Sequence, residues 1–119
     1  NARFVDCILV LAEFQAADLT DTTFDRGDLF SSDFTGANLT RAAVVGSRLA
    51  MASFRGANLD GADLTRADIT GALLEGAIYT PHTRWPAGFD PTTSGAVLVG
   101  DQAEAFRFLA LENEPRDNG

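Results

Sequence analysis

Residues 37–66 read ANLTR AAVVG SRLAM ASFRG ANLDG ADLTR, which is six consecutive groups of five residues. The third residue of every group is large and apolar, and the first is small. The same spacing extends outward from this stretch in both directions without a slip. The large residues at every fifth position are Phe4, Leu9, Phe14, Leu19, Phe24, Leu29, Phe34, Leu39, Val44, Leu49, Phe54, Leu59, Leu64, Ile69, Leu74 and Tyr79.

This five-residue period matches neither of the common secondary structures. A helix returns to the same face about every 3.6 residues and a strand about every 2, so a period of five would scatter the large residues around a helix. A square coil whose sides are each one group of five satisfies the pattern. Its large residues point to the axis, the small residues fill the corners, and turn-prone Asp, Asn and Gly stand at the bends.

The type of the large residue also repeats every twenty positions, as four sides per coil predict. Stacked coils would then place like residues on one another, and stacked Phe pairs gain about 0.5–1.5 kcal/mol beyond their burial. Sixteen repeats give about four coils at a spacing of about 4.8 Å. The expected core ladders are Phe14, Phe34 and Phe54, then Leu19, Leu39 and Leu59, and then Leu9, Leu29 and Leu49.

The cleanest repeats are Ala37-Asn38-Leu39-Thr40-Arg41, Ala57-Asn58-Leu59-Asp60-Gly61 and Ala62-Asp63-Leu64-Thr65-Arg66. They follow the motif A(D/N)LXX, and over residues 2–81 the chain resembles the pentapeptide-repeat family. The resemblance implies an all-β fold, namely a right-handed quadrilateral β-helix. It implies little about function.

The regular pattern stops after residue 81, and a solenoid must cover its terminal coil. Counting on in fives would put Pro81 at the next turn and the charged Arg84 at the next core position, which indicates that the repeat ends there. We expect residues 82–100 to form a capping loop with a short strand at 96–99, and Trp85 and Phe89 to cover the last coil. A similar Trp-Pro-x-Gly-Phe-Asp-Pro tail closes many bacterial members of the family.

Residues 101–112 have the pattern of a short α-helix. Asp101 and Glu104 resemble a capping box, and Phe106 lies on the apolar face with Ala103 and Leu109. This helix would pack on the capping loop or on a neighbouring molecule, and residues 113–119 would form a frayed tail. At the other end no cap precedes the first repeat, and the sequence begins with Asn1 rather than Met. A removed segment, a preceding domain or a partner would each cover that edge.

Composition and charge exclude several classes of function. The net charge of −8, with no Lys, disfavours direct binding of nucleic acid. No apolar stretch is long enough for a membrane span, and the single Cys excludes an internal disulfide. His82 and Cys7 lack the partners that catalysis or metal binding requires. The sequence therefore predicts a non-enzymatic cytoplasmic protein without a cofactor or metal.

Two features of the predicted surface bear on function. Residues that flank the large residue point outward, and on the face of Leu9 several of these are apolar, which is typical of an interface. The candidate interface consists of Ile8, Val10, Leu11, Phe30 and Met51, and Val5 and Val45 on the adjacent face would extend it. A preceding segment that covers these residues is the alternative. The acidic positions that stand out along the rod are Asp18, Asp28, Asp33 and Asp68.

These features give two hypotheses for the function. The first is a protein–protein interaction or scaffolding module that associates with itself or with a partner, alone or within a larger chain. The second follows from the family resemblance, because some members imitate the charge of a DNA duplex and bind type II topoisomerases such as DNA gyrase. This chain differs from those members in being short and in mixing Arg with its acidic residues.

Overall fold

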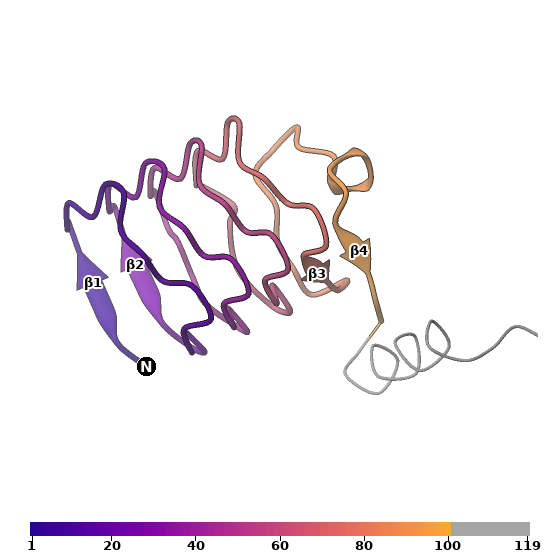
Figure 1. Ribbon diagram of the computed structural model, residues 1–119, viewed down its shortest axis with the longest axis horizontal. Helices are drawn as coiled ribbons and strands as arrows, with labels where there is room; N and C mark the ends of the chain where they lie inside the picture. Colours follow the sequence, from indigo (N-terminus) through magenta and orange to yellow (C-terminus); the bar gives the residue numbers. More distant parts are fainter. Residues whose placement is uncertain (101–119) are drawn as a thin grey trace, which may run out of the picture.

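The computed structural model describes residues 1–100 of the chain, and they form a coil with one turn for every twenty residues. Strand β1 (Arg3–Val5) pairs in parallel with β2 (Thr23–Asp25), one coil further on. Isolated parallel bridges continue this pairing on all four sides at the same spacing. At the far end β3 (Ile78–Tyr79) pairs in parallel with β4 (Val97–Leu98), so the coils stack along the long axis (Figure 1).

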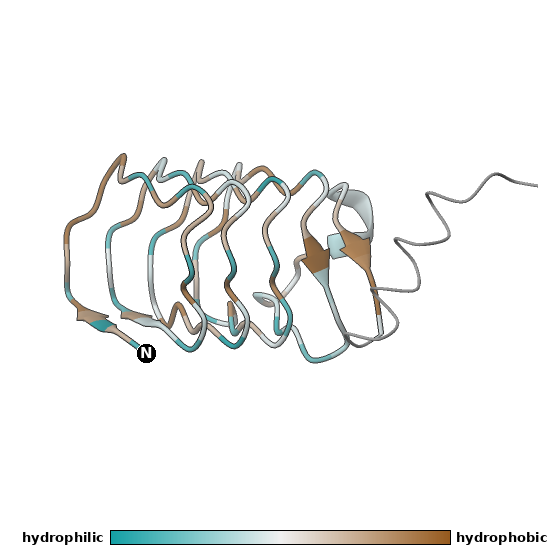
Figure 2. Cartoon of the chain, turned by 60° about the horizontal axis from the view of Figure 1, so that its bottom comes forward, coloured by the Kyte–Doolittle hydropathy of each residue, from teal (hydrophilic) through white to brown (hydrophobic). Residues whose placement is uncertain are grey.

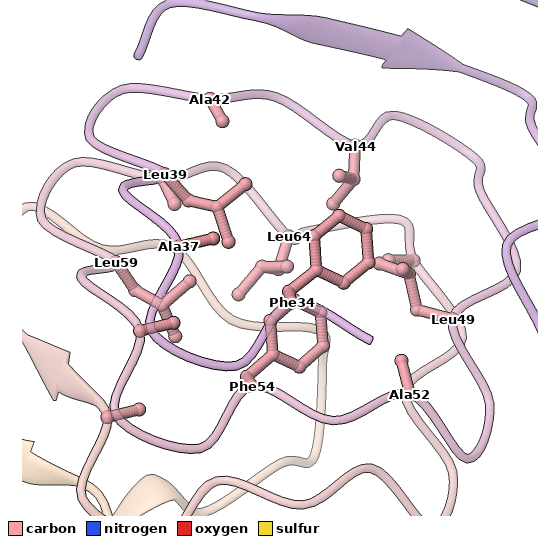
Figure 3. Close-up of a cluster of buried hydrophobic side chains, with 14 of the residues drawn as sticks. Phe34, Ala37, Leu39, Ala42, Val44, Leu49, Ala52, Phe54, Leu59 and Leu64 are labelled. Carbon is pink, nitrogen blue, oxygen red and sulfur yellow. The ribbon is translucent and has the colours of Figure 1, made fainter. Parts of the chain in front are cut away.

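The large residue of each repeat points to the axis, as the period of five predicts. Phe34 and Leu49 are essentially inaccessible to solvent, and Phe54 lies stacked against Phe34 with ring centroids 5.1 Å apart (Figure 3). Phe14 stacks on the other side of Phe34 at the same distance. In the first coil the ladder residues Leu9 and Phe14 are only partly buried, because no described coil lies beyond them.

The corners of the square lie two residues after each large residue. There the N–H of the next small residue donates to the carbonyl of the large residue, as Ala62 does to Leu59 at 3.0 Å. The residue directly before that small residue usually has a positive φ, which Gly61 adopts without a steric penalty (φ +71°). Asp and Asn stand in the bridges rather than at the bends, and each reaches forward to the bend with its side chain, as Asn38 Oδ1 does to the N–H of Thr40.

The capping segment departs from the fixed period by one residue. Arg84 does not enter the core, because one additional residue shifts the register and Arg84 pairs with Asp63, twenty-one residues earlier. Trp85 therefore takes the next inward place above Leu64, where it contacts Tyr79 edge-on at 5.4 Å and Phe89 at 5.1 Å.

The rest of the described cap is short. A 3-10 turn, η1 (Pro91–Thr93), begins after Asp90, whose side chain accepts the N–H of Thr92. Strand β4 lies within the predicted range 96–99 and returns the chain to the coil. The predicted helix at 101–112, Phe106 and the tail at 113–119 lie outside the described residues.

Candidate interaction surface

An apolar patch occupies one side of the rod near its N-terminal end. Ile8 is 82% exposed, Leu11 68%, Met51 55% and Val10 41%. Figure 2 shows the same concentration, since the first coil is coloured hydrophobic over much of its length. The sequence placed all four residues outward, and the structure agrees.

Phe30 belongs to the same side but is partly covered. The guanidinium carbon of Arg48 lies 4.3 Å from the centre of the Phe30 ring, and the same guanidinium contacts the Asp28 carboxylate at 3.3 Å. Such cation–π contacts contribute about 0.5–1 kcal/mol at exposed sites. Phe30 is therefore a half-buried edge of the patch rather than a free anchor.

Two patch residues stand at corners where a large side chain is unfavourable. Leu11 and Met51 have φ values of +62° and +63°, a left-handed conformation that disfavours residues with a Cβ atom. Met51 lies across the corner of the next coil, so that a Cβ added to Gly71 would meet its sulfur at 2.5 Å. The equivalent corner holds Gly in several repeats and other residues, such as Arg26 and Arg41, elsewhere, so what distinguishes Leu11 and Met51 is that they are apolar and exposed.

The charges on the rod are arranged in pairs between coils. Three arginines contact acids twenty residues earlier and one contacts an acid twenty residues later: Arg26 with Asp6, Arg41 with Asp21, Arg48 with Asp28, and Arg55 with Glu75. Exposed pairs of this kind contribute little to stability, typically about 0–1 kcal/mol. Their main effect is to break the acidic surface into patches of mixed sign.

Asp18, Asp33 and Asp68 share one local geometry. The Oδ1 atom of each accepts hydrogen bonds from the hydroxyl and the backbone N–H of a Thr two residues on, with distances between 2.6 and 3.1 Å. These bonds lower the pKa of each carboxyl below its usual value. Asp28 differs, because it pairs with Arg48 and accepts the N–H of Phe30. The four acids therefore have evident roles within the coil.

We expect the thermal midpoint of unfolding to be nearly constant from about pH 5 to 8 and to fall below about pH 4. A carboxyl whose pKa is lower in the folded state stabilises the fold above its unfolded pKa, and this contribution is lost as the pH falls through the folded pKa. Thermal unfolding followed by circular dichroism tests this. Replacing Asp18, Asp33 and Asp68 with Asn should flatten the acid limb, and an unchanged limb would exclude these groups.

The described residues lack the cluster of side chains that a metal centre needs. Within residues 1–100 no group of three or more His, Cys, Asp or Glu side chains could hold a metal ion. The N–H of His82 donates to the hydroxyl of Thr80, and the partly buried Cys7 lies 3.5 Å from the Val5 carbonyl. No helix in this range is long and apolar enough to cross a membrane.

Comparison with known proteins identifies the repeat. A model of the family of pentapeptide repeats matches residues 1–36 and 37–76, with eight copies. The chain belongs to the pentapeptide-repeat family. No curated protein matches the sequence.

Several solved pentapeptide-repeat proteins share the fold, a right-handed β-helix solenoid. A protein from the thylakoid lumen of Arabidopsis thaliana is 18% identical with a TM-score of 0.66, over 92% of this chain and 75% of that one. Rfr23 from the cyanobacterium Cyanothece is 28% identical with a TM-score of 0.57, over 71% and 60%. A trypsin-treated form of QnrB1, a plasmid-mediated fluoroquinolone resistance protein, is 18% identical with a TM-score of 0.51, over 98% and 70%. Cytoplasmic location stays a prediction, because one of these proteins comes from the thylakoid lumen.

Proposed function

We propose that this pentapeptide-repeat rod is a non-catalytic protein–protein interaction module whose contact surface is the apolar patch. The observation that carries the proposal is the exposure of Ile8, Leu11 and Met51 on one side of the rod. Burying apolar surface contributes about 25 cal/mol per Å², so removing such side chains from water favours association.

The first partner to consider is a second copy of the chain. A two-fold interface brings the same patch together from both molecules, which suits a surface that is apolar at its centre. Arg48 and Asp28 lie at the edge of this patch beside Phe30. They would provide charges of both signs to a symmetric rim.

We expect the double substitution Leu11→Asp and Met51→Asp to weaken self-association at least about tenfold, because each new carboxylate would lose its hydration on burial. Sedimentation equilibrium over a concentration series measures the effect. The fold should survive, since both side chains point to solvent. Leu98→Asp is the matched control, because Leu98 is 57% exposed but lies at the other end of the rod. Equal loss in both variants would contradict the role of the patch.

Imitation of DNA is the second candidate. The net charge of −8 favours it, because ionised carboxylates along the rod could take the place of phosphates. The ion pairs between coils weigh against it, since arginines alternate with the acids. The likeness to QnrB1 supports the fold alone at 18% identity. A DNA gyrase supercoiling assay over a salt series separates the two candidates, because only a DNA imitator would inhibit or protect in a salt-sensitive manner.

A further inference from the structure

A groove of about 360 Å³ opens at the C-terminal end of the rod, on the same face as the apolar patch. On one side lies the last repeat of the Leu9 face, residues 67–71, and on the other lies the capping segment 86–89. The bridges on this face run from Ile8 to Asp28, Arg48 and Asp68, and no described residue pairs beyond Asp68. The preceding face does continue, because Arg84 pairs with Asp63, and so does the opposite face, because β4 pairs with β3 (Figure 1).

The groove exposes the hydrogen-bonding edge of a missing strand. In each earlier coil of this face the large residue donates its N–H to the next coil, as Leu49 does to the Asp68 carbonyl at 2.7 Å. The corner residue does the same, as Met51 does to the Thr70 carbonyl at 2.8 Å. The equivalent N–H groups of Ile69 and Gly71 have no backbone partner within residues 1–100.

The carbonyl of Ala67 completes this edge. In the coil below, the Ser47 carbonyl accepts the N–H of Asp68 at 3.0 Å, and the Gly27 carbonyl accepts that of Arg48 at 2.9 Å. The Ala67 carbonyl has no such donor among the described residues. One acceptor and two donors therefore line the groove at the spacing of a parallel strand, which is the arrangement that strand addition uses.

The charge of the occupant follows from the column of side chains that it would extend. This column reads Asp28, Arg48 and Asp68, so its signs alternate. Arg48 contacts Asp28 at 3.3 Å. On the adjacent face Asp63 is likewise followed by a basic residue, Arg84, where the coil does continue. A basic residue above Asp68 would continue the alternation, whereas an acidic one would face a carboxylate directly.

We infer that this groove binds an extended peptide segment of a partner protein, with the order small, basic, large apolar, parallel to residues 67–71. The basic residue donates its N–H to the Ala67 carbonyl and accepts the N–H of Ile69 with its own carbonyl. The carbonyl two residues later accepts the N–H of Gly71. The large apolar side chain covers Ile69, which is only partly buried, and lies beside Phe89, which lines the same groove.

A single strand fits this place better than a whole second rod. The coil already rises by one level at Arg84, on the face that precedes the groove, and at β4, on the opposite face. These segments would collide with the flat end of another coil before it reached residues 67–71. The groove and the apolar patch share no residue, although Met51 of the patch lies beside Gly71 of the groove. The inference rests on the backbone groups and charges of residues 67–71, so it does not require the patch to bind a partner.

The test uses the full chain and a blocked peptide, Thr-Gly-Ser-Arg-Leu-Thr-Gly, which repeats the small, basic, apolar order of residues 47–49. Trp85 is the only tryptophan and contacts Phe89 at 5.1 Å, so its fluorescence reports binding, and the NMR signals of the Ile69 and Gly71 amides locate it. We expect saturable binding that shifts both amides. N-methylation of the peptide Arg, or its replacement by Asp, should weaken binding at least about tenfold.

A variant of the protein tests the charge separately from the fold. Asp68→Asn should keep the turn, because Asn38 accepts the N–H and hydroxyl of Thr40 just as Asp68 accepts those of Thr70. We expect this variant to bind the Arg peptide about five- to tenfold more weakly than the unsubstituted protein does. A peptide with Gln in place of Arg should bind equally well to the variant and to the unsubstituted protein, and Asp18→Asn is the distant control. Unshifted amides at Ile69 and Gly71, or equal binding of the N-methylated peptide, would overturn the inference.

Discussion

Phe34→Ala is expected to lower the free energy of unfolding by about 3–5 kcal/mol, which is a large part of the total for a domain of this size. Phe34 is 1% exposed and lies in the middle of the aromatic ladder. Its ring stacks on Phe14 and Phe54 at 5.1 Å and meets Phe24 edge-on at 6.2 Å. Truncation removes these contacts and leaves a cavity that the fixed spacing of the coils prevents from closing. Urea unfolding followed by circular dichroism measures the change.

Two further variants establish that the cost comes from the ladder. Phe34→Leu keeps most of the volume, so it should cost clearly less than Phe34→Ala. Phe14→Ala should also cost less, because Phe14 is only partly buried in the first coil. Equal losses in the free energy of unfolding for Phe34→Ala and Phe14→Ala would contradict the expectation that the loss follows the burial of each ring along the axis.

The sequence predicts the body of the rod because each repeat contacts mainly the repeats twenty residues before and after it. Burial of Phe34 and Leu49 follows from spacing alone. The same rule fails at the cap, where one extra residue shifts the register so that Trp85, and not Arg84, lies above Leu64. A fixed period cannot show such an insertion, although Pro81 marks the place where the regular turn ends.

For the candidate surface, the spacing predicts which residues are exposed but not which are covered by side chains of the next coil. Ile8, Leu11 and Met51 are exposed because positions beside the large residue point outward. The partial cover of Phe30 by Arg48 was missed, since it joins residues in different positions of two coils. Writing the sequence in rows of twenty places Arg48 directly below Asp28, two columns from Phe30. The groove at residues 67–71 was beyond this approach, because it depends on how the capping segment leaves the coil.

Ala57→Asp is expected to destabilise the rod by about 3–5 kcal/mol, because it places an uncompensated charge in the interior. Ala57 is 0% exposed and fills the small position at a corner. Burial raises the pKa of the introduced carboxyl, so the folded state holds its proton to higher pH than the unfolded state does. The penalty should therefore be smaller near pH 4 than near pH 8, which urea unfolding at both pH values measures.

Ala57→Ser separates polarity from unsatisfied charge. Two other small positions carry Ser, and each hydroxyl donates to a carbonyl twenty-three residues earlier: Ser32 to Leu9 at 2.8 Å and Ser47 to Phe24 at 3.0 Å. The same geometry offers the Phe34 carbonyl to a hydroxyl at position 57, so this substitution should cost less than about 1 kcal/mol. A Ser variant as unstable as the Asp variant would show that the corner rejects any added atom. Steric fit, and not the loss of hydration, would then decide which residues the small position accepts.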